Sequence, residues 1–124
     1  MRAIPARRFQ VINLRTNAIV GCVDLADSGP ARRRGLLGRK GLDEGEGLWI
    51  KPCEAVHTFG MRFDIDLIFL NRRQIVTKLR ANLRPWRIAG SIRAGSVLEM
   101  SPGTIASTST RSGDQLSLQP LNSA

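Results

Sequence analysis

The sequence lacks long apolar runs, and this excludes a membrane-spanning helix. Its longest uninterrupted apolar stretch, residues 67–70, suits a short β-strand, whereas a spanning helix needs roughly 20 apolar residues. The N-terminus is basic, but no apolar segment typical of a signal peptide separates it from the polar residues Gln10 and Asn13. We therefore expect a cytoplasmic protein with no membrane partner.

Cysteine and histidine are scarce, which argues against a metal or redox centre. The chain has two cysteines, Cys22 and Cys53, and a single histidine, His57. The cysteines do not have the spacing of a CxxC or zinc-finger motif, and zinc sites usually combine several His and Cys ligands. We expect no metal and no cofactor, and we interpret both cysteines as buried thiols.

Acidic residues are also few, so the chain is strongly basic. It carries 19 Lys and Arg against 10 Asp and Glu, a formal net charge of +9. Most of the positive residues are arginines, whose planar donors suit carboxylate and phosphate groups, so an anionic partner is plausible. The positive residues are nevertheless spread over both halves of the chain.

One basic cluster is dense enough to contact the phosphates of a nucleic acid. Against this, the chain has no tyrosine, only four Phe and two Trp, and no aromatic residues interleaved with the cluster. We therefore favour a solvated basic face and keep nucleic-acid binding as the weaker alternative. The residues of this cluster are Arg32, Arg33, Arg34, Arg39 and Lys40.

Short segments of alternating apolar and polar residues indicate β-strands. Two pairs of such segments, each joined by turn residues, predict two β-hairpins. Glycine-rich residues 38–47 predict a loop. The predicted strands are 9–14, 19–25, 48–50, 56–61, 63–70, 74–79, 97–100 and 115–118, and the predicted short helices are 31–37 and 104–109.

These elements predict a β-dominated α+β fold. A chain of 124 residues with 42% hydrophobic residues can bury one core. Closely spaced short strands favour a compact antiparallel β-barrel-like or sandwich domain with one or two short helices. We predict a single domain over residues 1–124, with its core at about 9–118 and flexible tails at 1–7 and 119–124. The oligomeric state stays open.

The segment around His57 is the leading candidate for a binding site. It follows the glycine-rich loop and precedes the strongest predicted strand. A few polar groups beside apolar side chains are typical of a small-molecule pocket, so we predict a pocket for a small polar or anionic ligand. The alternative is a histidine held in the core for structural reasons. The candidate ligand-binding residues are Trp49, His57, Thr58, Met61, Arg62 and Asp64.

Two acidic residues lie among apolar neighbours in predicted strands. Asp66 and Glu99 would be costly to bury without partners, so each needs a hydrogen-bond or charge partner. For Asp66 we expect a cross-strand arginine or His57, and Glu99 poses the same problem. The enzyme alternative, a hydrolase or isomerase, uses His57 as a general base oriented by Asp66 or Glu99. A Cys53–His57 dyad is disfavoured, because Pro52 and the extended backbone that follows it make contact between side chains four residues apart improbable.

Several motifs occur in order along the chain. They are RGLLGR at 34–39, EGLWIKPC at 46–53, HTFGMRF at 57–63, ID at 65–66 with FL at 69–70, and SVLE at 96–99 with GD at 113–114. Together they resemble the family called domain of unknown function 192, over nearly the whole chain. The resemblance implies a small, mostly antiparallel β-barrel-like domain with short helices. It implies no catalytic residues, because the family has no established activity.

Overall fold

The computed structural model describes residues 7–121, and these form nine strands and two short helices. The predicted β-dominated α+β fold is confirmed. The predicted tails fall largely on residues 1–6 and 122–124, which lie outside the described residues. In order, the elements are β1 (Arg8–Asn13), β2 (Ile19–Ala26), α1 (Gly29–Arg34), β3 (Glu46–Ile50), β4 (Ala55–His57), β5 (Ile65–Leu70), β6 (Val76–Leu83), β7 (Ile88–Gly90), β8 (Ser96–Met100), α2 (Thr104–Ser107) and β9 (Leu116–Pro120).

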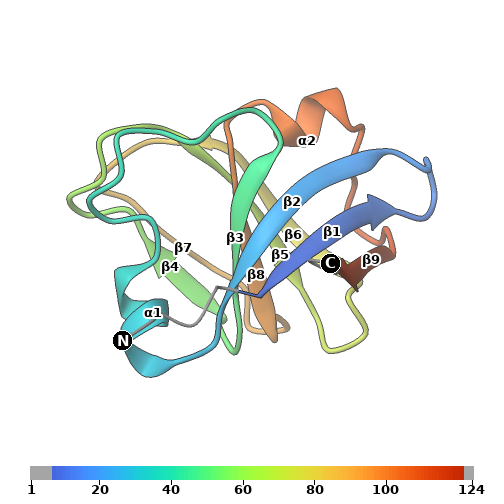
Figure 1. Cartoon of the computed structure of the whole chain (residues 1–124), viewed down its shortest axis with the longest axis horizontal. Helices are drawn as coiled ribbons and strands as arrows, with labels where there is room; N and C mark the ends of the chain where they lie inside the picture. The colour runs from blue at the N-terminus through green and yellow to red at the C-terminus, as the bar shows by residue number, and fades with distance from the viewer. Residues whose placement is uncertain (1–6, 122–124) are drawn as a thin grey trace.

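Seven strands form one curled sheet in the order β6-β5-β8-β3-β2-β1-β9 (Figure 1). Neighbouring strands are antiparallel except β2 and β3, which run parallel because α1 and its loop carry the chain back between them. The sheet curls until its two edges meet, where Val76 N donates to Asp114 O at 2.8 Å. The remaining strands, β4 and β7, form a small antiparallel sheet beside α1.

The first helix is shorter than predicted. Ser28 caps its N-terminus, since its Oγ accepts a hydrogen bond from Ala31 N at 3.1 Å. Gly35 ends the helix with a φ of +49°, a conformation that glycine adopts without strain. Leu36 and Leu37 therefore follow the helix and pack against the core from the start of the loop.

Other element boundaries differ from the prediction where turns intervene. The strand predicted at 56–61 ends at His57, because Met61 N closes a turn onto Thr58 O at 3.1 Å and Gly60 takes a φ of +80°. Strand β7 was not predicted, since it has only three residues and follows a proline-containing loop. Strand β9 extends to Pro120, two residues beyond the end of the predicted strand.

The sheet separates two apolar clusters, which we call the α1-side core and the α2-side core. Successive residues of a strand point to opposite faces, so neighbours in sequence enter different cores. The α1-side core includes Leu36, Leu48, Ile50, Leu67, Phe69 and Val97. The α2-side core includes Phe9, Trp49, Ile68, Leu70, Leu98 and Met100.

No helix within residues 7–121 has the length and apolar character to cross a membrane.

Candidate functional site

A cavity of about 1330 Å³ opens beside α1. Its walls come from α1 and the residues after it, from the 50–57 segment that leads from β3 into β4, from the β5–β6 turn, and from β8. The crossover between β2 and β3 creates this space, because it holds α1 over the α1-side core. The residues used below that line the cavity are Arg32, Arg33, Arg34, Cys53, His57 and Glu99.

Glu99 is the buried polar group of the cavity. It lies on β8 opposite Leu67 and Leu48, so its side chain points to the α1 side of the sheet and is only 2% exposed. Its Oε1 has no hydrogen-bond partner within the described part of the chain. Burial raises the pKa of the Glu99 carboxyl to about 7, while the positive charge of Arg39 opposes the rise. The group is therefore poised to exchange a proton near neutral pH.

Gly35 leaves room for this carboxyl. A Cβ at position 35 would lie 3.2 Å from Glu99 Oε1, closer than most van der Waals contacts. The glycine that ends α1 thus also keeps the approach to the carboxyl open.

Three consecutive arginines bring positive charge to the same cavity. Arg32, Arg33 and Arg34 occupy the last turn of α1, and all three line the cavity. Cations are favoured near helix C-termini, which suits this placement. Arg32 Nη1 lies 3.4 Å from Pro52 O, so α1 contacts the opposite wall at that point. All three arginines are exposed, as a solvated basic face requires, and they also line the cavity.

The thiol of Cys53 also lines the cavity. It donates a hydrogen bond to Ala55 O at 3.1 Å rather than to a histidine. Burial raises the pKa of this thiol, so it is protonated at neutral pH. The prediction of two buried thiols is wrong, because Cys22 and Cys53 are both partly exposed.

His57 lies at the rim of the cavity, at the end of β4. Its side chain is exposed rather than held inside the core, although one ring nitrogen meets a backbone amide as the structural alternative expected. The ring Nδ1 accepts a long hydrogen bond of 3.3 Å from Phe59 N. Among residues 7–121, no hydrogen bond joins His57 to Asp66 or Glu99, so a general base oriented by a carboxylate is not assembled here.

Asp66 has a structural role on the opposite face of the sheet. It is fully buried on the α2 side, where Oδ1 accepts from Asn82 N and Oδ2 accepts from Ile105 N, both at 2.8 Å. The expected partner, a cross-strand arginine or His57, is wrong, because two backbone amides satisfy the carboxylate. Asp66 thereby ties β6 and α2 to β5 and faces away from the cavity.

The other predicted binding residues divide between the cavity and the rest of the fold. Met61 lines the cavity, whereas Trp49 packs in the α2-side core. Thr58 is buried and bonds to the 84–87 loop. Arg62 is exposed and Asp64 is half-buried, and neither lines the cavity.

The rest of the predicted basic cluster and the rest of the cavity lining do not coincide. Arg39 and Lys40 of the basic cluster are exposed and do not line the cavity, although the charge of Arg39 acts on Glu99. Within the described residues, no three His, Cys, Asp or Glu side chains gather as a metal site would require. The sequence did not single out Asn71, Arg72, Gln74 or Ser96, which the fold brings to the cavity.

The family model that matches this chain is that of DUF192, described as an uncharacterised ACR, and it covers residues 11–118. The chain belongs to this family. The resemblance drawn from the motifs is therefore confirmed. No curated protein matches the chain.

Two solved structures share the fold of this DUF192 domain. One is the crystal structure of a putative transcription regulator from Sinorhizobium meliloti 1021, with a TM-score of 0.80, 20% identity, and 95% of this chain and 97% of that chain covered. The other is a protein of unknown function from Novosphingobium aromaticivorans DSM 12444, with a TM-score of 0.73, 20% identity, and 90% and 83% covered. At this identity the likeness extends to the fold alone.

Proposed function

We propose that this domain is a cytoplasmic binding module whose cavity takes a small anionic ligand that also carries a hydrogen-bond donor. The observation that supports the proposal best is the unpartnered Oε1 of Glu99, buried in a cavity lined by Arg32, Arg33 and Arg34. Buried polar groups without a partner are rare in folded proteins and need a specific explanation. A ligand donor that bonds to Glu99 supplies one.

The two kinds of charge define two ends of the ligand. Arginine donors suit a phosphate or carboxylate group, so the anionic end of the ligand contacts α1. A hydroxyl or ammonium group at the other end donates to Glu99. The cavity, at about 1330 Å³, exceeds the volume of roughly 300–1,000 Å³ usual for ligand pockets, so a small ligand fills part of it.

Three related compounds test this proposal by isothermal titration calorimetry. Phosphoethanolamine carries both groups, inorganic phosphate carries only the anion, and ethanolamine carries only the donor. We expect phosphoethanolamine to bind more tightly than either of the others. Glu99→Leu should remove the advantage of phosphoethanolamine over phosphate, and Arg33→Ala should weaken both anions.

Arg111→Ala is the matched control, since it removes an exposed arginine that does not line the cavity. Its affinities should equal those of the wild type. Equal weakening by Arg111→Ala and Arg33→Ala would mean that general charge attracts the anion, and would contradict the proposal.

Catalysis at the same cavity is the second candidate function. It is favoured by the pKa of Glu99, raised to about 7 by burial, because a general acid or base works best with a pKa near the operating pH. His57, Cys53 and Glu54 also line the cavity. A screen of ester and phosphoester substrates should then find an activity that Glu99→Gln abolishes while circular dichroism shows an intact fold.

The third candidate, nucleic-acid binding by the Arg32 to Lys40 cluster, receives less support. Three of its five residues line the cavity, which leaves Arg39 and Lys40 for contacts outside it. Binding through the cluster would weaken steeply with salt and would be lost in an Arg39→Ala, Lys40→Ala variant.

A further inference from the structure

Three aromatic rings form an exposed stack that begins at the rim of the cavity with His57, and we call it the aromatic stack. The rings of His57 and Phe59 lie 5.1 Å apart at 30°, and those of Phe59 and Trp86 lie 5.9 Å apart at 25°. Trp86 is 66% exposed and Phe59 is 42% exposed. Phe59 lies between the other two rings, so it supports the indole from behind and leaves the outer face of Trp86 open to solvent.

The loop that carries Trp86 is held in place by hydrogen bonds to Thr58. Thr58 is fully buried, and its Oγ1 donates to Arg84 O at 2.7 Å and accepts from Arg87 N at 2.9 Å. Its backbone also bonds twice to the same loop, since Thr58 N donates to Arg87 O and Trp86 N donates to Thr58 O. These bonds fix the 84–87 loop against the turn that carries Phe59.

The backbone at Trp86 is strained by this arrangement. Its φ is +64°, a conformation that is uncommon for residues other than glycine and unusual for one with a bulky side chain. Such strained residues persist where the surrounding structure enforces them, and they concentrate at functional sites. Hydrophobic burial does not explain the strain, because the side chain that it orients faces solvent.

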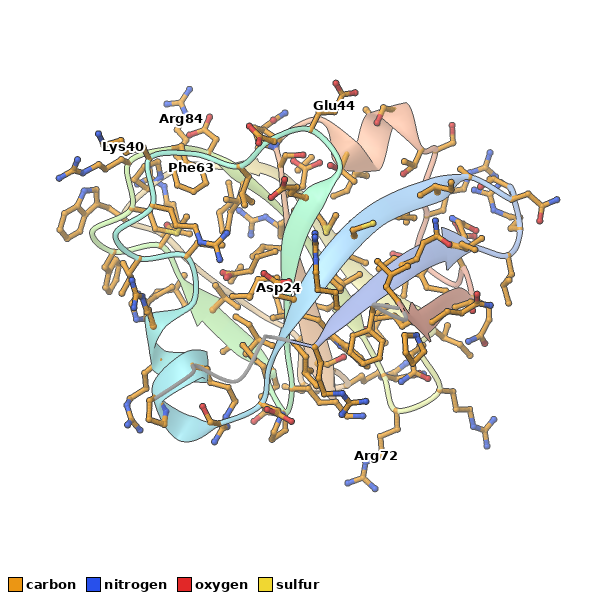
Figure 2. All side chains as sticks on the ribbon, in the orientation of Figure 1. Asp24, Lys40, Glu44, Phe63, Arg72 and Arg84 are labelled. Carbon is orange, nitrogen blue, oxygen red and sulfur yellow. The ribbon has the colours of Figure 1, made fainter. Side chains whose placement is uncertain are left out.

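The segments that carry the aromatic stack are basic, although Glu54 and Asp64 adjoin them in the sequence. Residues 55–63 and 84–93, which carry the stack and strand β7, include four arginines and no acidic residue. Arg62, Arg84 and Arg87 are exposed, and the side chain of Arg84 points away from the fold (Figure 2). The Nη1 of Arg87 donates to Trp86 O at 3.3 Å and to Pro85 O at 3.4 Å, so its positive charge lies against the backbone of the loop that carries the indole.

We propose that the aromatic stack binds single-stranded nucleic acid. A base stacks on the outer face of Trp86, and the phosphates on either side contact Arg84 and Arg87. Aromatic platforms combined with a positive surface are the usual means of binding single strands without sequence readout. The basic surroundings favour this anionic partner over a second copy of the chain, whose stack would bring the same positive charges together. This proposal does not depend on a ligand in the cavity.

No local pattern in the sequence marks this surface as a nucleic-acid site, because its parts are far apart along the chain. Phe59 and Trp86 are separated by 26 residues and come together only when Thr58 joins their two loops. The missing aromatic interleaving of the Arg32 to Lys40 cluster therefore says nothing about the aromatic stack.

Fluorescence anisotropy with a labelled twelve-nucleotide oligo-dT tests the proposal on the full chain. We expect wild type to bind at low salt, to bind the matching duplex more weakly, and to lose affinity as salt rises. Trp86→Ala should weaken binding by at least about five-fold, the smallest effect expected of a lost stacking contact. Trp86→Phe should recover most of that loss. An Arg84→Ala, Arg87→Ala variant should bind weakly and show a smaller salt dependence.

Two controls separate the aromatic stack from general charge. Ile92→Ala removes an apolar side chain that is almost fully exposed but does not belong to the stack, and Arg111→Ala removes an arginine elsewhere. Both should bind oligo-dT as wild type does. If Trp86→Ala binds as tightly as wild type, or if duplex and single strand bind equally, the proposal is overturned. It is also overturned if sedimentation shows a wild-type dimer that Trp86→Ala dissociates, because the stack is then a protein interface.

Discussion

The two sides of the sheet treat a buried carboxyl group in opposite ways. On the α2 side, Asp66 is fully buried and both of its oxygens accept backbone hydrogen bonds. On the α1 side, Glu99 is almost as deeply buried, yet Oε1 has no partner among the described residues. Burial therefore does not separate these two carboxyls, whereas the completeness of their hydrogen bonds does.

Strand parity explains how two neighbouring strands produce this contrast. Asp66 pairs with Met100 and Leu67 pairs with Glu99 across the β5–β8 ladder. Because paired residues share a face and successive residues alternate, Asp66 and Glu99 project to opposite sides of the same sheet. One of them meets α2, and the other meets the cavity beside α1.

The largest effect should follow removal of the structural carboxyl. Asp66→Ala leaves the part-buried amides of Asn82 and Ile105 without their acceptors, and an orphaned buried donor costs about 1–3 kcal/mol. We expect urea unfolding at pH 7 to show a loss of about 3 kcal/mol or more. Asp64→Ala, at a half-buried position of the same segment, should cost far less. If Asp66→Ala were as stable as wild type, the hydrogen bonds of Asp66 would not stabilise the fold, and the contrast with Glu99 would be lost.

Glu99 should instead make the domain less stable as the pH rises. Its folded pKa of about 7 lies above the ordinary 4.5, so between these values the folded state binds more protons than the unfolded state. Stability present below pH 4.5 is then lost as the pH rises through 7, by an amount on the order of 3 kcal/mol. Urea unfolding across this range should show the decline in wild type. Glu99→Gln should abolish it and be the more stable protein at pH 8.

A third carboxyl sharpens the contrast, because it has a charged partner. Asp114 accepts hydrogen bonds from the side chains of Arg15 and Asn13, and the Arg15 bond is the main cause of its lowered pKa. Its stabilising effect is present above the ordinary pKa of 3.8 and is lost as the pH falls further. Asp114→Asn should cost about 2 kcal/mol at pH 7, the loss expected for hydrogen bonds to a charged group, and less in acid. An undiminished cost at pH 2 would show that packing, not charge, is responsible.

The sequence predicted the sheet better than it predicted the site. Alternating apolar residues identified β1 and β2, and short, mostly apolar segments identified β5 and β8, which are buried on both faces. Asp66 and Glu99 look alike in the sequence, since each is an acidic residue between apolar residues. Only the register of the ladder and the crossover through α1 separate their roles, and both depend on contacts between distant parts of the chain.

The parts of the candidate site were visible singly but not as a group. The arginines of α1 and Glu99 both attracted attention, yet about 65 residues lie between them and nothing local places them around one cavity. Cys53 was considered as a buried thiol and as a partner of His57, whereas its thiol bonds to the nearby carbonyl of Ala55. Strand β7 escaped prediction for a related reason, since its partner β4 lies about 30 residues earlier.

The smallest effect should be that of His57→Ala on stability. The ring is exposed, and its one described hydrogen bond is the long contact from Phe59 N, so the free energy of unfolding should change by no more than about 0.5 kcal/mol. Thr58→Val, at the next position, removes a buried hydroxyl with close partners and should cost clearly more. Urea unfolding of the pair checks this difference. A neutral His57→Ala does not by itself indicate function, because exposure alone predicts it. What would assign His57 a role is a change in ligand or oligonucleotide affinity in a variant of unchanged stability.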